Sequence, residues 1–574
     1  MKFTSIILKN FRNFENVEVK LDNKNVVFGL NDIGKSNFLA SIRYLLDSSY
    51  RKNGLIDSDF YLGNCKNDIE ITLKIDISNF NEADSRKIRT MMKGSITSES
   101  NEIYIQLKSK YNPKTLCGDI YLYWGVDYDN LDEVPSNQSR YELDKYFNIV
   151  YIDSAVSLEK VFKKYTREIF KGEGSISDEE IGTLNKNIIE LNSNVSKLST
   201  ISKLKSEIVD EYKRFRDESS FDITIQSEME IGNLYTKLVP YIQDESKKSY
   251  PTSGDGRKKL LAYTLLTLEN RKIEDEKINV FLVEELENHL HRSVQIELSY
   301  QLFTDNLYKY MFLTTHSSLL VSQMDNVNLI KLYKENKIIG KSYIYNVPKE
   351  YAAVKHKLNQ NLAEAIYANV VMLVEGPSEK TIFECILREK CPIYEAKGGY
   401  ILEVQGINFK SYVDVLKSLG VDVIIKTDND MQKVRGQEIY YFSGANRCAS
   451  IIQLSKRYEG DNVDSKKYKE NTQYVLQLKK DFYDSNSELI ATLEEQNVFL
   501  SKVDLENDLY EVISPTMDLL ANESGSSKNG VDYLQDSKLY NMVKLCDKLS
   551  SQEYNDIYNH KRFKCLRELV DKCN

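Results

Sequence analysis

Long apolar runs and paired cysteine motifs are both missing from this sequence of 574 residues. No run approaches the ~20 consecutive apolar residues that a membrane-spanning helix requires, so we expect no such helix. The eight cysteines are scattered, and no CxxC spacing indicates a zinc site. A chain of this length does not need disulfides to stabilise a small core, so we expect reduced thiols in a cytoplasm. The N-terminus runs into an amphipathic strand and does not have the pattern of a signal peptide.

An excess of positive charge is also missing, and histidine is scarce. The net charge of −9 argues against a surface coated for non-specific DNA binding, although a local basic groove remains compatible with it. There are only five histidines, and His289, His291 and His316 lie within 28 residues of one another. The length predicts two or more domains, each with its own core.

The stretch from Gly29 to Ser36 reads G-L-N-D-I-G-K-S and fits the P-loop pattern. Its glycines let backbone N–H groups approach phosphates, Lys35 can reach the β- and γ-phosphates, and the Ser36 hydroxyl suits Mg²⁺. An apolar strand at 25–28 precedes it and an apolar helical face at 38–46 follows, which disfavours a simple glycine turn beside a surface lysine. The predicted nucleotide-binding residues are Asn31, Asp32, Ile33, Gly34, Lys35 and Ser36.

The N-terminal segment contains a motif that extends this prediction. Strands expected at 3–8 and 17–21 flank the sequence N-F-R-N-F at 10–14. Strand, N-F-R-N-F turn, strand and P-loop together resemble the start of the ABC-type ATPase heads of the SMC, RecF and OLD families. The resemblance implies a twisted α/β ATPase core that closes on nucleotide as a head-to-head dimer.

Residues 156 to about 245 have a helical pattern instead. Positions 183–231 contain neither Gly nor Pro, and apolar residues from Ile181 to Leu198 repeat at the 3–4 spacing of a heptad seam, which slips over 201–208. Residues 181–215 as one helix would make a rod of roughly 50 Å at ~1.5 Å per residue. Two interpretations stay open: a helical hairpin packed within one subunit, or an insertion that holds two subunits together.

Three later segments resemble further ATPase motifs. Ser253 and Gly254 lie in Y-P-T-S-G-D-G-R, where the ABC signature would lie, and in the family this segment completes the nucleotide pocket of the opposite subunit. The apolar strand 279–283 ends at Glu284 and Glu285, like a Walker B strand. The resemblance implies that Glu284 holds Mg²⁺ and Glu285 polarises the attacking water. The family usually has Asp at the first position, which makes Glu284 a departure.

The third of these segments is a strand expected at 311–315 that ends at His316. This position fits the family's switch histidine, which senses the γ-phosphate. A capping or packing role is the alternative for each histidine, but three of the five fall on these motifs.

A second domain begins after a connecting helix. An apolar strand at 370–374 ends at Glu375 and leads into a helix that begins near Glu379, and a second strand at 423–427 ends at Asp428 and Asp430. Open α/β sheets place ligands at the carboxyl ends of parallel strands. Carboxylates gathered there repel one another unless a hard cation such as Mg²⁺ or Mn²⁺ bridges them. The alternative is that these carboxylates cap helices.

Glu-Gly after one strand and Asp-x-Asp after another resembles the Toprim domain of topoisomerases, primases and OLD nucleases. In this light Asp504 and Glu506, in D-L-E-N-D after the apolar stretch 498–500, are candidates for a second metal. Lys538 could neutralise charge on the scissile phosphate, although by itself it would be read as a solvated lysine.

An ATPase head followed by a Toprim domain is the layout of OLD-family nucleases, and the motifs resemble most closely those of the Gabija anti-phage defence system. The resemblance implies a metal-dependent DNA endonuclease of the bacterial cytoplasm, nucleotide control of cleavage, a homotetramer, double-stranded DNA as substrate and a UvrD-like helicase partner. It divides the chain into an ATPase domain at 1–348 with the insertion at about 156–245, a connecting helix at 349–368 and a Toprim domain at 369–574.

The sequence therefore predicts an α/β protein with an ABC-type head, a helical insertion and a Toprim domain with C-terminal helices. In a two-metal site, one ion activates water and the other stabilises the leaving oxygen. The predicted ligands are Glu375, Glu379, Asp428, Asp430, Asp504 and Glu506. Two alternatives remain: an ATP-driven DNA clamp or repair scaffold, for which these carboxylates have no use, and a topoisomerase-like or primase-like enzyme, for which no DNA-breaking tyrosine stands out.

Overall fold

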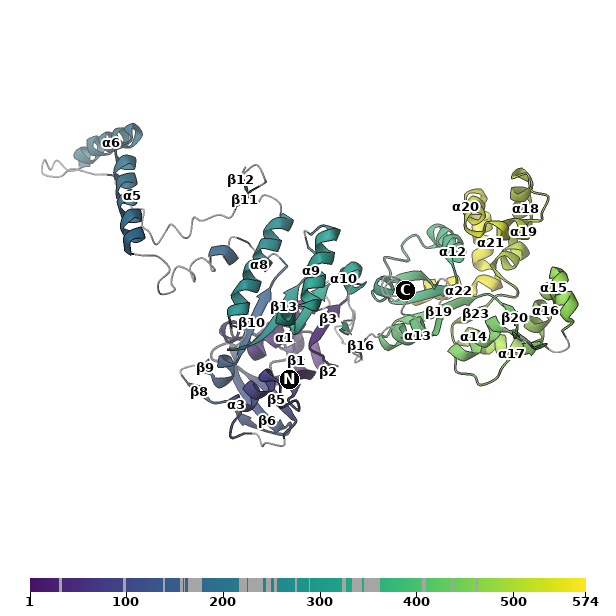
Figure 1. Cartoon of the computed structure of the whole chain (residues 1–574), viewed down its shortest axis with the longest axis horizontal. Helices are drawn as coiled ribbons and strands as arrows, with labels where there is room; N and C mark the ends of the chain where they lie inside the picture. Colours follow the sequence, from purple (N-terminus) through teal and green to yellow (C-terminus); the bar gives the residue numbers. More distant parts are fainter. Residues whose placement is uncertain are drawn as a thin grey trace.

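The computed structural model describes residues 1–29, 34–95, 100–137, 140–154, 158, 160–163, 178–215, 225, 241–243, 249–251, 255–273, 276–288, 290–322, 327–332, 343–344, 362–404, 409–435, 437–460 and 463–573. Two sheets form the N-terminal half, and a third sheet with many helices forms the C-terminal half (Figure 1). The predicted α/β class is confirmed. None of the helices in these ranges is long and apolar enough to cross a bilayer.

The first sheet of the N-terminal half is antiparallel. Its strand order is β2-β1-β4-β5-β6-β7. Each long strand alternates buried apolar and more exposed residues, as a sheet with one covered face requires. The bounds are β1 (Lys2–Phe11), β2 (Phe14–Lys20), β4 (Ile69–Asp76), β5 (Glu102–Asn112), β6 (Cys117–Asp127) and β7 (Asn130–Glu133).

The second sheet has the order β10-β13-β14-β3-β15-β16 and is parallel except for the pair β15–β16. Its central strands are buried on both faces, which explains their continuous apolar sequences. The bounds are β3 (Lys24–Phe28), β10 (Phe147–Ile152), β13 (Ile278–Glu284), β14 (Tyr310–Thr315), β15 (Asn328–Lys331) and β16 (Tyr343–Ile344).

Helix α1 (Lys35–Leu46) lies between these two sheets, because its apolar face shares one core with β4, β5 and alternate residues of β13. Helices α8 (Asp255–Ile273) and α9 (Arg292–Thr304) cover the other face of the second sheet. The P-loop is thereby placed at the end of β3, where β13 and β14 also end. Helices α3 (Ala83–Met91) and α10 (Ser318–Ser322) complete this half.

The insertion is helical, but it is not one rod. Helix α5 (Asp178–Ser196) ends before α6 (Ser199–Phe215) begins, and the two helices lie apart from both sheets in Figure 1. The rod that residues 181–215 would form as one helix is therefore interrupted at 197–198. Ser196, Ser199 and Thr200 flank the break, and serine and threonine are less favourable in helix interiors than at helix ends. The strands β11 (Tyr241–Gln243) and β12 (Ser249–Pro251) pair after it.

The C-terminal half is built on a four-stranded parallel sheet, β18-β17-β19-β23. One face packs on helices α12, α18, α20, α21 and α22, and the other on α13, α14 and α17. The strands are β17 (Val370–Val374), β18 (Gly399–Glu403), β19 (Asp422–Thr427) and β23 (Val498–Leu500). The helices are α12 (Pro377–Lys390), α13 (Phe409–Ser418), α14 (Ser443–Ile451), α15 (Ser465–Glu470), α16 (Thr472–Ser485), α17 (Ser487–Glu495), α18 (Leu505–Glu523), α19 (Gly530–Asp536), α20 (Lys538–Lys548), α21 (Ser551–Asn559) and α22 (Lys564–Cys573). A small sheet joins β20 (Met431–Lys433), β21 (Tyr440–Phe442) and β22 (Glu459–Gly460).

The two halves meet just before β17. The Tyr367 ring lies 5.3 Å from the Phe28 ring, and the Lys331 ammonium donates a hydrogen bond of 2.7 Å to the carbonyl of Ala368. Of the predicted connecting helix at 349–368, residues 349–361 lie outside the described ranges, and residues 362–365 are helical.

Candidate functional site

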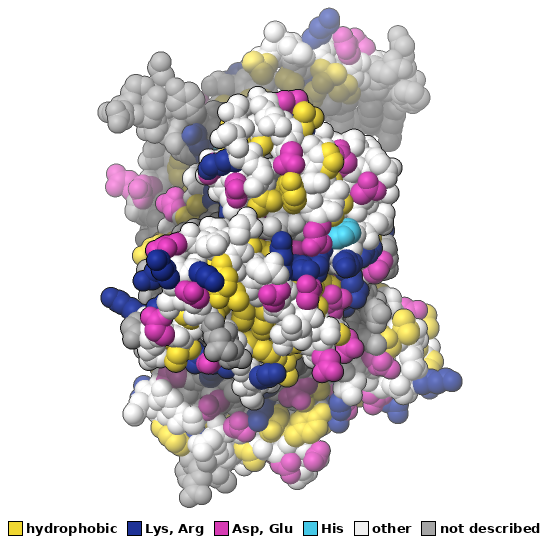
Figure 2. All heavy atoms as spheres, turned by 90° about the vertical axis from the view of Figure 1, so that its right-hand side faces the viewer, with side chains coloured by type: hydrophobic (Ala, Val, Ile, Leu, Met, Phe, Trp, Pro, Cys, Tyr) yellow, Lys and Arg dark blue, Asp and Glu magenta, His cyan; other side chains and the backbone are white. Residues whose placement is uncertain are grey.

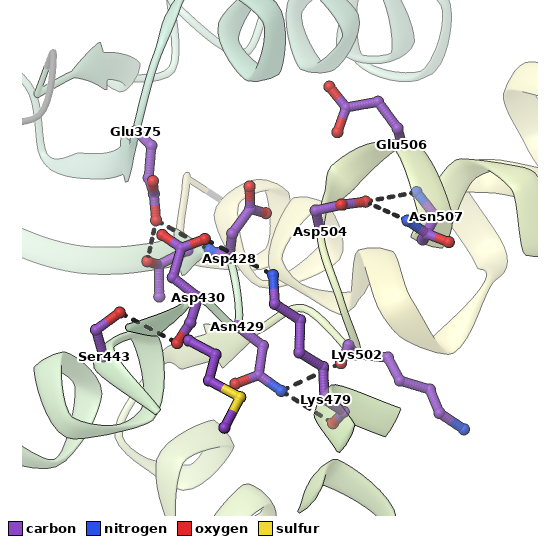
Figure 3. Close-up of polar contacts among 12 residues, drawn as sticks. Glu375, Asp428, Asn429, Asp430, Ser443, Lys479, Lys502, Asp504, Glu506 and Asn507 are labelled. Carbon is purple, nitrogen blue, oxygen red and sulfur yellow. Dashed lines mark hydrogen bonds and ion pairs between the residues drawn. The ribbon is translucent and has the colours of Figure 1, made fainter. Parts of the chain in front are cut away.

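The carboxyl ends of β17 and β19 bring two predicted carboxylates together. Glu375 follows β17, and its Oε1 accepts hydrogen bonds from the Asp428 backbone N–H (3.0 Å) and the Thr427 hydroxyl. Figure 3 shows the side chains of Glu375, Asp428 and Asp430 close together at this edge. The parallel pairing of β17 with β19 causes this meeting, since their ends lie at the same edge of the sheet.

Burial makes this group of carboxylates electrostatically unfavourable. Burial, helped by the negative charges of Glu375 and Glu506, raises the pKa of Glu379 to about 7. Burial and four neighbouring carboxylates raise the pKa of Asp428 well above its usual range. Removal from water disfavours the charged form of each acid, and like charges nearby disfavour it further. A bound cation would relieve both effects.

Glu506 is the most deeply buried member of the group, with 1% of its surface exposed. Burial raises the pKa of Glu506, and its Oε2 is buried without a hydrogen-bond partner among the described residues. Its Oε1 lies 3.4 Å from the ammonium of Lys538, the first residue of α20. Burial lowers the pKa of Lys538, but the surrounding carboxylates outweigh this and the net shift is upward.

Asp504 and Asp430 are engaged with other partners. Asp504 caps the N-terminus of α18, accepting hydrogen bonds of 2.8 Å from the Asn507 backbone and side chain (Figure 3), and Gln535 donates to its other oxygen at 3.0 Å. Asp430 lies 3.5 Å from Arg447 and 3.8 Å from Lys479. Capping the N-terminus of α18 is therefore one role of Asp504.

The donor chemistry fits a hard cation. The group consists of carboxylate oxygens, which Mg²⁺ and Mn²⁺ prefer, and it contains the unpartnered Oε2 of Glu506. Within the described ranges, however, no three His, Cys, Asp or Glu side chains converge closely enough to form a ready-made metal cage. Glu375, Glu379, Asp428 and Glu506 would hold a cation after small side-chain movements, with Asp430 and Asp504 beside them.

The P-loop forms the second site. Lys35 is buried at the start of α1 and donates a 3.3 Å hydrogen bond to the Gly29 carbonyl. Gly34 has a φ of 101°, and a Cβ there would overlap the Asn13 amide, so only glycine suits the position. Ser36 is exposed, so its hydroxyl is accessible to a ligand. Residues Asn31, Asp32 and Ile33 lie outside the described ranges, as do Ser253 and Gly254.

The ends of β13 and β14 place the remaining ATPase residues beside one another. The Tyr151 hydroxyl donates to Glu284 Oε2 at 2.8 Å. Glu285 Oε1 lies 3.1 Å from His316 Nε2, and the Asn288 amide donates to Glu285 Oε2 at 2.8 Å. Glu285 has a φ of 42°, an uncommon value for a non-glycine residue that often marks functional sites. His291, by contrast, caps the N-terminus of α9, and His289 lies outside the described ranges.

Several residues that contact the two sites were not predicted from the sequence. Arg447 on α14 lies 2.5 Å from Glu375 and neutralises part of the carboxylate charge, but nothing in its sequence context signals this. Tyr151, which holds Glu284, gave no signal either. Arg12 and Asn13 could have been found, because they lie in N-F-R-N-F: both bond to Asn37 on α1, at 2.9 and 2.8 Å.

Among solved structures, the chain is similar to the SMC head domain from Thermotoga maritima (15% identity, TM-score 0.30, covering 61% of this chain and 100% of that one). It is also similar to the C-terminal region of the Burkholderia pseudomallei OLD protein (15% identity, TM-score 0.23, covering 36% and 100%).

The family follows from the family models and from a relative in sequence. Residues 1–321 match the family described as AAA ATPase domain, and residues 366–430 match the overcoming lysogenization defect protein-like TOPRIM domain. The chain is 41% identical over 581 residues to endonuclease GajA of Bacillus cereus (strain VD045), and the match covers 99% of both. The chain therefore belongs to the GajA endonuclease family, in which an AAA ATPase domain is joined to an OLD-like Toprim domain.

Proposed function

We propose that this protein is a metal-dependent DNA endonuclease of an anti-phage Gabija system, and that nucleotide binding at its ATPase domain regulates cleavage. The observation that carries the proposal is the buried carboxylate group at the ends of β17 and β19, with raised pKa values at Glu379 and Asp428. The name of the 41% identical relative supports an endonuclease. A DNA clamp of the SMC or RecF type has no use for such a group, which argues against that alternative.

The proposed ligands of Mg²⁺ or Mn²⁺ are Glu375, Glu379, Asp428, Asp430, Asp504 and Glu506. Two bound cations would activate a water and stabilise the leaving oxygen of the phosphodiester. Glu379, whose pKa is raised to about 7, would give up its proton when a cation binds. Arg447 holds Glu375 in place. Lys538 is half-exposed beside Glu506, and we propose that its ammonium contacts a phosphate oxygen of the DNA.

Double-stranded DNA is the proposed substrate, and the charge distribution suits a local contact. Figure 2 shows the face at the right-hand end of Figure 1, where Lys and Arg side chains gather near the middle among scattered acidic ones. A protein with a net charge of −9 can still bind phosphates through such a cluster, because screening limits the reach of distant charges to about 10 Å. Binding should then weaken steeply with salt.

For the ATPase domain we propose binding of ATP with Mg²⁺ by residues 29–36, with Glu284 as a metal ligand. Glu285 would orient water and His316 would contact the γ-phosphate, since their side chains already meet at 3.1 Å. Ser253 and Gly254 would complete the pocket of the opposite subunit. Binding without fast hydrolysis suits a sensor, and Glu284 in place of the usual Asp supports this role. A ligand of this kind acts through its different affinities for two states.

Assembly completes the proposal. We propose a homotetramer in which the insertion at about 156–245 joins subunits, and a UvrD-like helicase, GajB, as partner in the bacterial cytoplasm. Exposed apolar residues of the insertion support a subunit contact: Leu191 on α5 is 46% exposed, and Leu198, between α5 and α6, is 54% exposed. We retain the division into ATPase domain (1–348), connecting helix (349–368) and Toprim domain (369–574).

The test is incubation of the purified protein with phage and plasmid DNA, with Mg²⁺ or Mn²⁺, across a range of ATP concentrations. The proposal requires cleavage that EDTA stops and that ATP modulates at constant free Mg²⁺. Metal-independent cleavage would contradict the assigned site, and absence of cleavage under all conditions would contradict the nuclease function.

A further inference from the structure

A positive side chain lies between two of the proposed metal ligands. Arg447, on α14, donates a hydrogen bond of 2.5 Å to Glu375 Oε1 and one of 2.8 Å to the Thr427 hydroxyl oxygen. Its other terminal nitrogen lies 3.5 Å from Asp430 Oδ2. One guanidinium therefore connects the carboxylate that follows β17 with a carboxylate that follows β19. A hard cation that bridged the ends of these strands would have to contact the same two carboxylates.

The backbone around Asp430 fixes the helix that carries this arginine. The Ser443 hydroxyl and the Gly444 N–H donate to the Asp430 carbonyl, at 3.1 and 3.2 Å, and Figure 3 shows the first of these bonds. A Cβ at Gly444 would lie 2.1 Å from the Asp428 carbonyl oxygen, so only glycine allows this close approach. Arg447 follows about one turn later on α14. Its position beside the carboxylates is therefore built into the fold.

The carboxylate oxygen that Arg447 contacts in Glu375 is already fully used. The Thr427 hydroxyl and the Asp428 backbone N–H also donate to this oxygen. A carboxylate oxygen offers about two lone pairs, so a cation that binds it has to displace a donor. Arg447 is the donor that can leave, because its side chain is 27% exposed and reaches water. Thr427 is buried, and the third donor belongs to the backbone.

Charge repulsion points the same way. An arginine side chain stays positively charged, and like charges a few ångströms apart repel strongly where water is partly excluded. A divalent ion at Glu375 and Asp430 therefore competes with the Arg447 guanidinium. The other carboxylates differ: among the described residues, neither Glu379 nor Asp428 has a cationic side chain within 4 Å, and the pKa of each is raised.

We propose that Arg447 is an internal cation, which neutralises Glu375 and Asp430 only in the metal-free protein and leaves them when Mg²⁺ or Mn²⁺ binds. This inference rests on the proposed function, since it concerns the same metal site. The exchange raises the metal concentration at which the site fills above what the carboxylates alone would require. The opposite interpretation is that Arg447 stays in place and orients Glu375 toward the metal. The two interpretations predict opposite changes in metal affinity when Arg447 is replaced.

The first measurement is Mn²⁺ binding to the full-length protein without nucleotide, from the EPR signal of free Mn²⁺. The binding that Glu375→Ala weakens identifies the Toprim site. Arg447→Gln should bind Mn²⁺ at this site at least about tenfold more tightly than the wild type, which corresponds to ~1.4 kcal/mol. Arg447→Lys keeps the charge but loses the planar fork that reaches both carboxylates, so it should give a smaller gain in the same direction.

The matched control is Lys479→Gln. It also removes one positive charge beside the carboxylates, because the Lys479 ammonium lies 3.8 Å from Asp430. The gain in Mn²⁺ affinity should be no more than about threefold, as for a loosely held ion pair. Equal gains in Lys479→Gln and Arg447→Gln would reflect general attraction and overturn the exchange. Unchanged or weaker binding by Arg447→Gln would also overturn it, in favour of an orienting role.

The second measurement is thermal unfolding in EDTA and in saturating Mn²⁺. In EDTA, Arg447→Gln should melt below the wild type, because Glu375 and Asp430 lose their internal partner. Mn²⁺ should raise the Tm of the variant more than that of the wild type, because tighter binding stabilises the folded state more. An equal or smaller rise contradicts the exchange. If Arg447→Gln does not fold, Arg447→Lys decides both measurements.

Failure of the proposed function gives different results. A wild-type protein without Mn²⁺ binding that Glu375→Ala weakens contradicts the proposed metal site, and the exchange with it. A protein that binds Mn²⁺ there but cleaves no DNA contradicts only the nuclease function, and the measured affinities still decide the exchange.

Discussion

Two sites of this molecule lie at the ends of parallel strands: β13 and β14 in the ATPase domain, and β17 and β19 in the Toprim domain. They differ in how their carboxylates are partnered. In both, buried parallel strands end in carboxylates. In the ATPase domain each carboxylate has a partner that can balance it, such as the Tyr151 hydroxyl for Glu284 and His316 for Glu285. In the Toprim domain Glu379 and Asp428 are buried among other acids, and their pKa values rise.

This difference indicates what each site needs in order to work. The ATPase residues are pre-organised by hydrogen bonds before any ligand arrives, as a binding pocket should be. The buried Toprim carboxylates Glu379 and Asp428 are destabilised in their charged forms, which supports the proposed cation as their partner. Function at the Toprim site should therefore depend strongly on removal of carboxylate charges and on pH. Function at the ATPase site should depend on the geometry of its residues and on assembly of subunits.

The largest expected effect is on cleavage. Glu375→Ala or Asp428→Ala should reduce metal-dependent DNA cleavage by roughly 10²–10³-fold or more, the scale of losing one preorganised catalytic group. Gel assays of plasmid cleavage measure it, with melting curves and light scattering to check fold and mass. The matched control is Glu403→Ala, which removes a carboxylate at the end of β18 on the same sheet. Full cleavage by both site variants would remove the basis for the Toprim site.

Disruption of the proposed subunit contact should affect the ATPase site more than the Toprim site. Leu191→Asp with Leu198→Asp should lower the oligomer mass in light scattering, because burying those charges at a subunit contact costs several kcal/mol. The control adds the same charge at exposed polar positions of the same insertion, Asn187→Asp with Asn194→Asp. If the ATPase pocket needs the opposite subunit, ATP binding should weaken in the first variant. An unchanged mass of the folded protein would favour a hairpin within one subunit.

Stability against pH tests the repulsion at the Toprim site. The pKa of Glu379 is raised from 4.5 to about 7 in the folded chain. The unfolded state therefore binds fewer protons between these values, and the metal-free protein should lose stability as pH rises from about 4.5 to 7. Glu379→Gln should remove about 3 kcal/mol of this loss. Urea unfolding at pH 5 and pH 8 measures it, and Mg²⁺ should stabilise the wild type more at pH 8. A pH profile identical in the two proteins would contradict the assignment.

The smallest effect concerns nucleotide control. ATP at millimolar levels should suppress cleavage by the wild type, and Lys35→Ala should weaken that suppression about tenfold, or ~1.4 kcal/mol, without removing the metal-dependent cut. The titration must hold free Mg²⁺ constant, because ATP chelates it. Stimulation by ATP, or equal suppression of the variant, would show that this P-loop does not gate the nuclease.

The strands could be predicted well from sequence. The expected strands 370–374 and 423–427 correspond to β17 and, within one residue, to β19. Buried parallel strands have continuous apolar sequences, and such runs are readable without tertiary information. The helical insertion at 181–215 was predicted less well. A heptad pattern indicates which residues share a face of a helix, but it does not indicate that the helix ends at Ser196 and a new one begins at Ser199.

By itself, the sequence determined the order of the motifs and the type of each group: a P-loop, a double carboxylate after β13, and acids after β17 and β19. These depend on local chemistry and strand ends, which neighbouring residues encode. Only the tertiary structure decided which groups meet. Arg447 reaches Glu375 across 72 residues, and Tyr151 reaches Glu284 across 133. Burial of Glu506 and the resulting charge repulsion likewise arise from packing between distant segments, which no local pattern records.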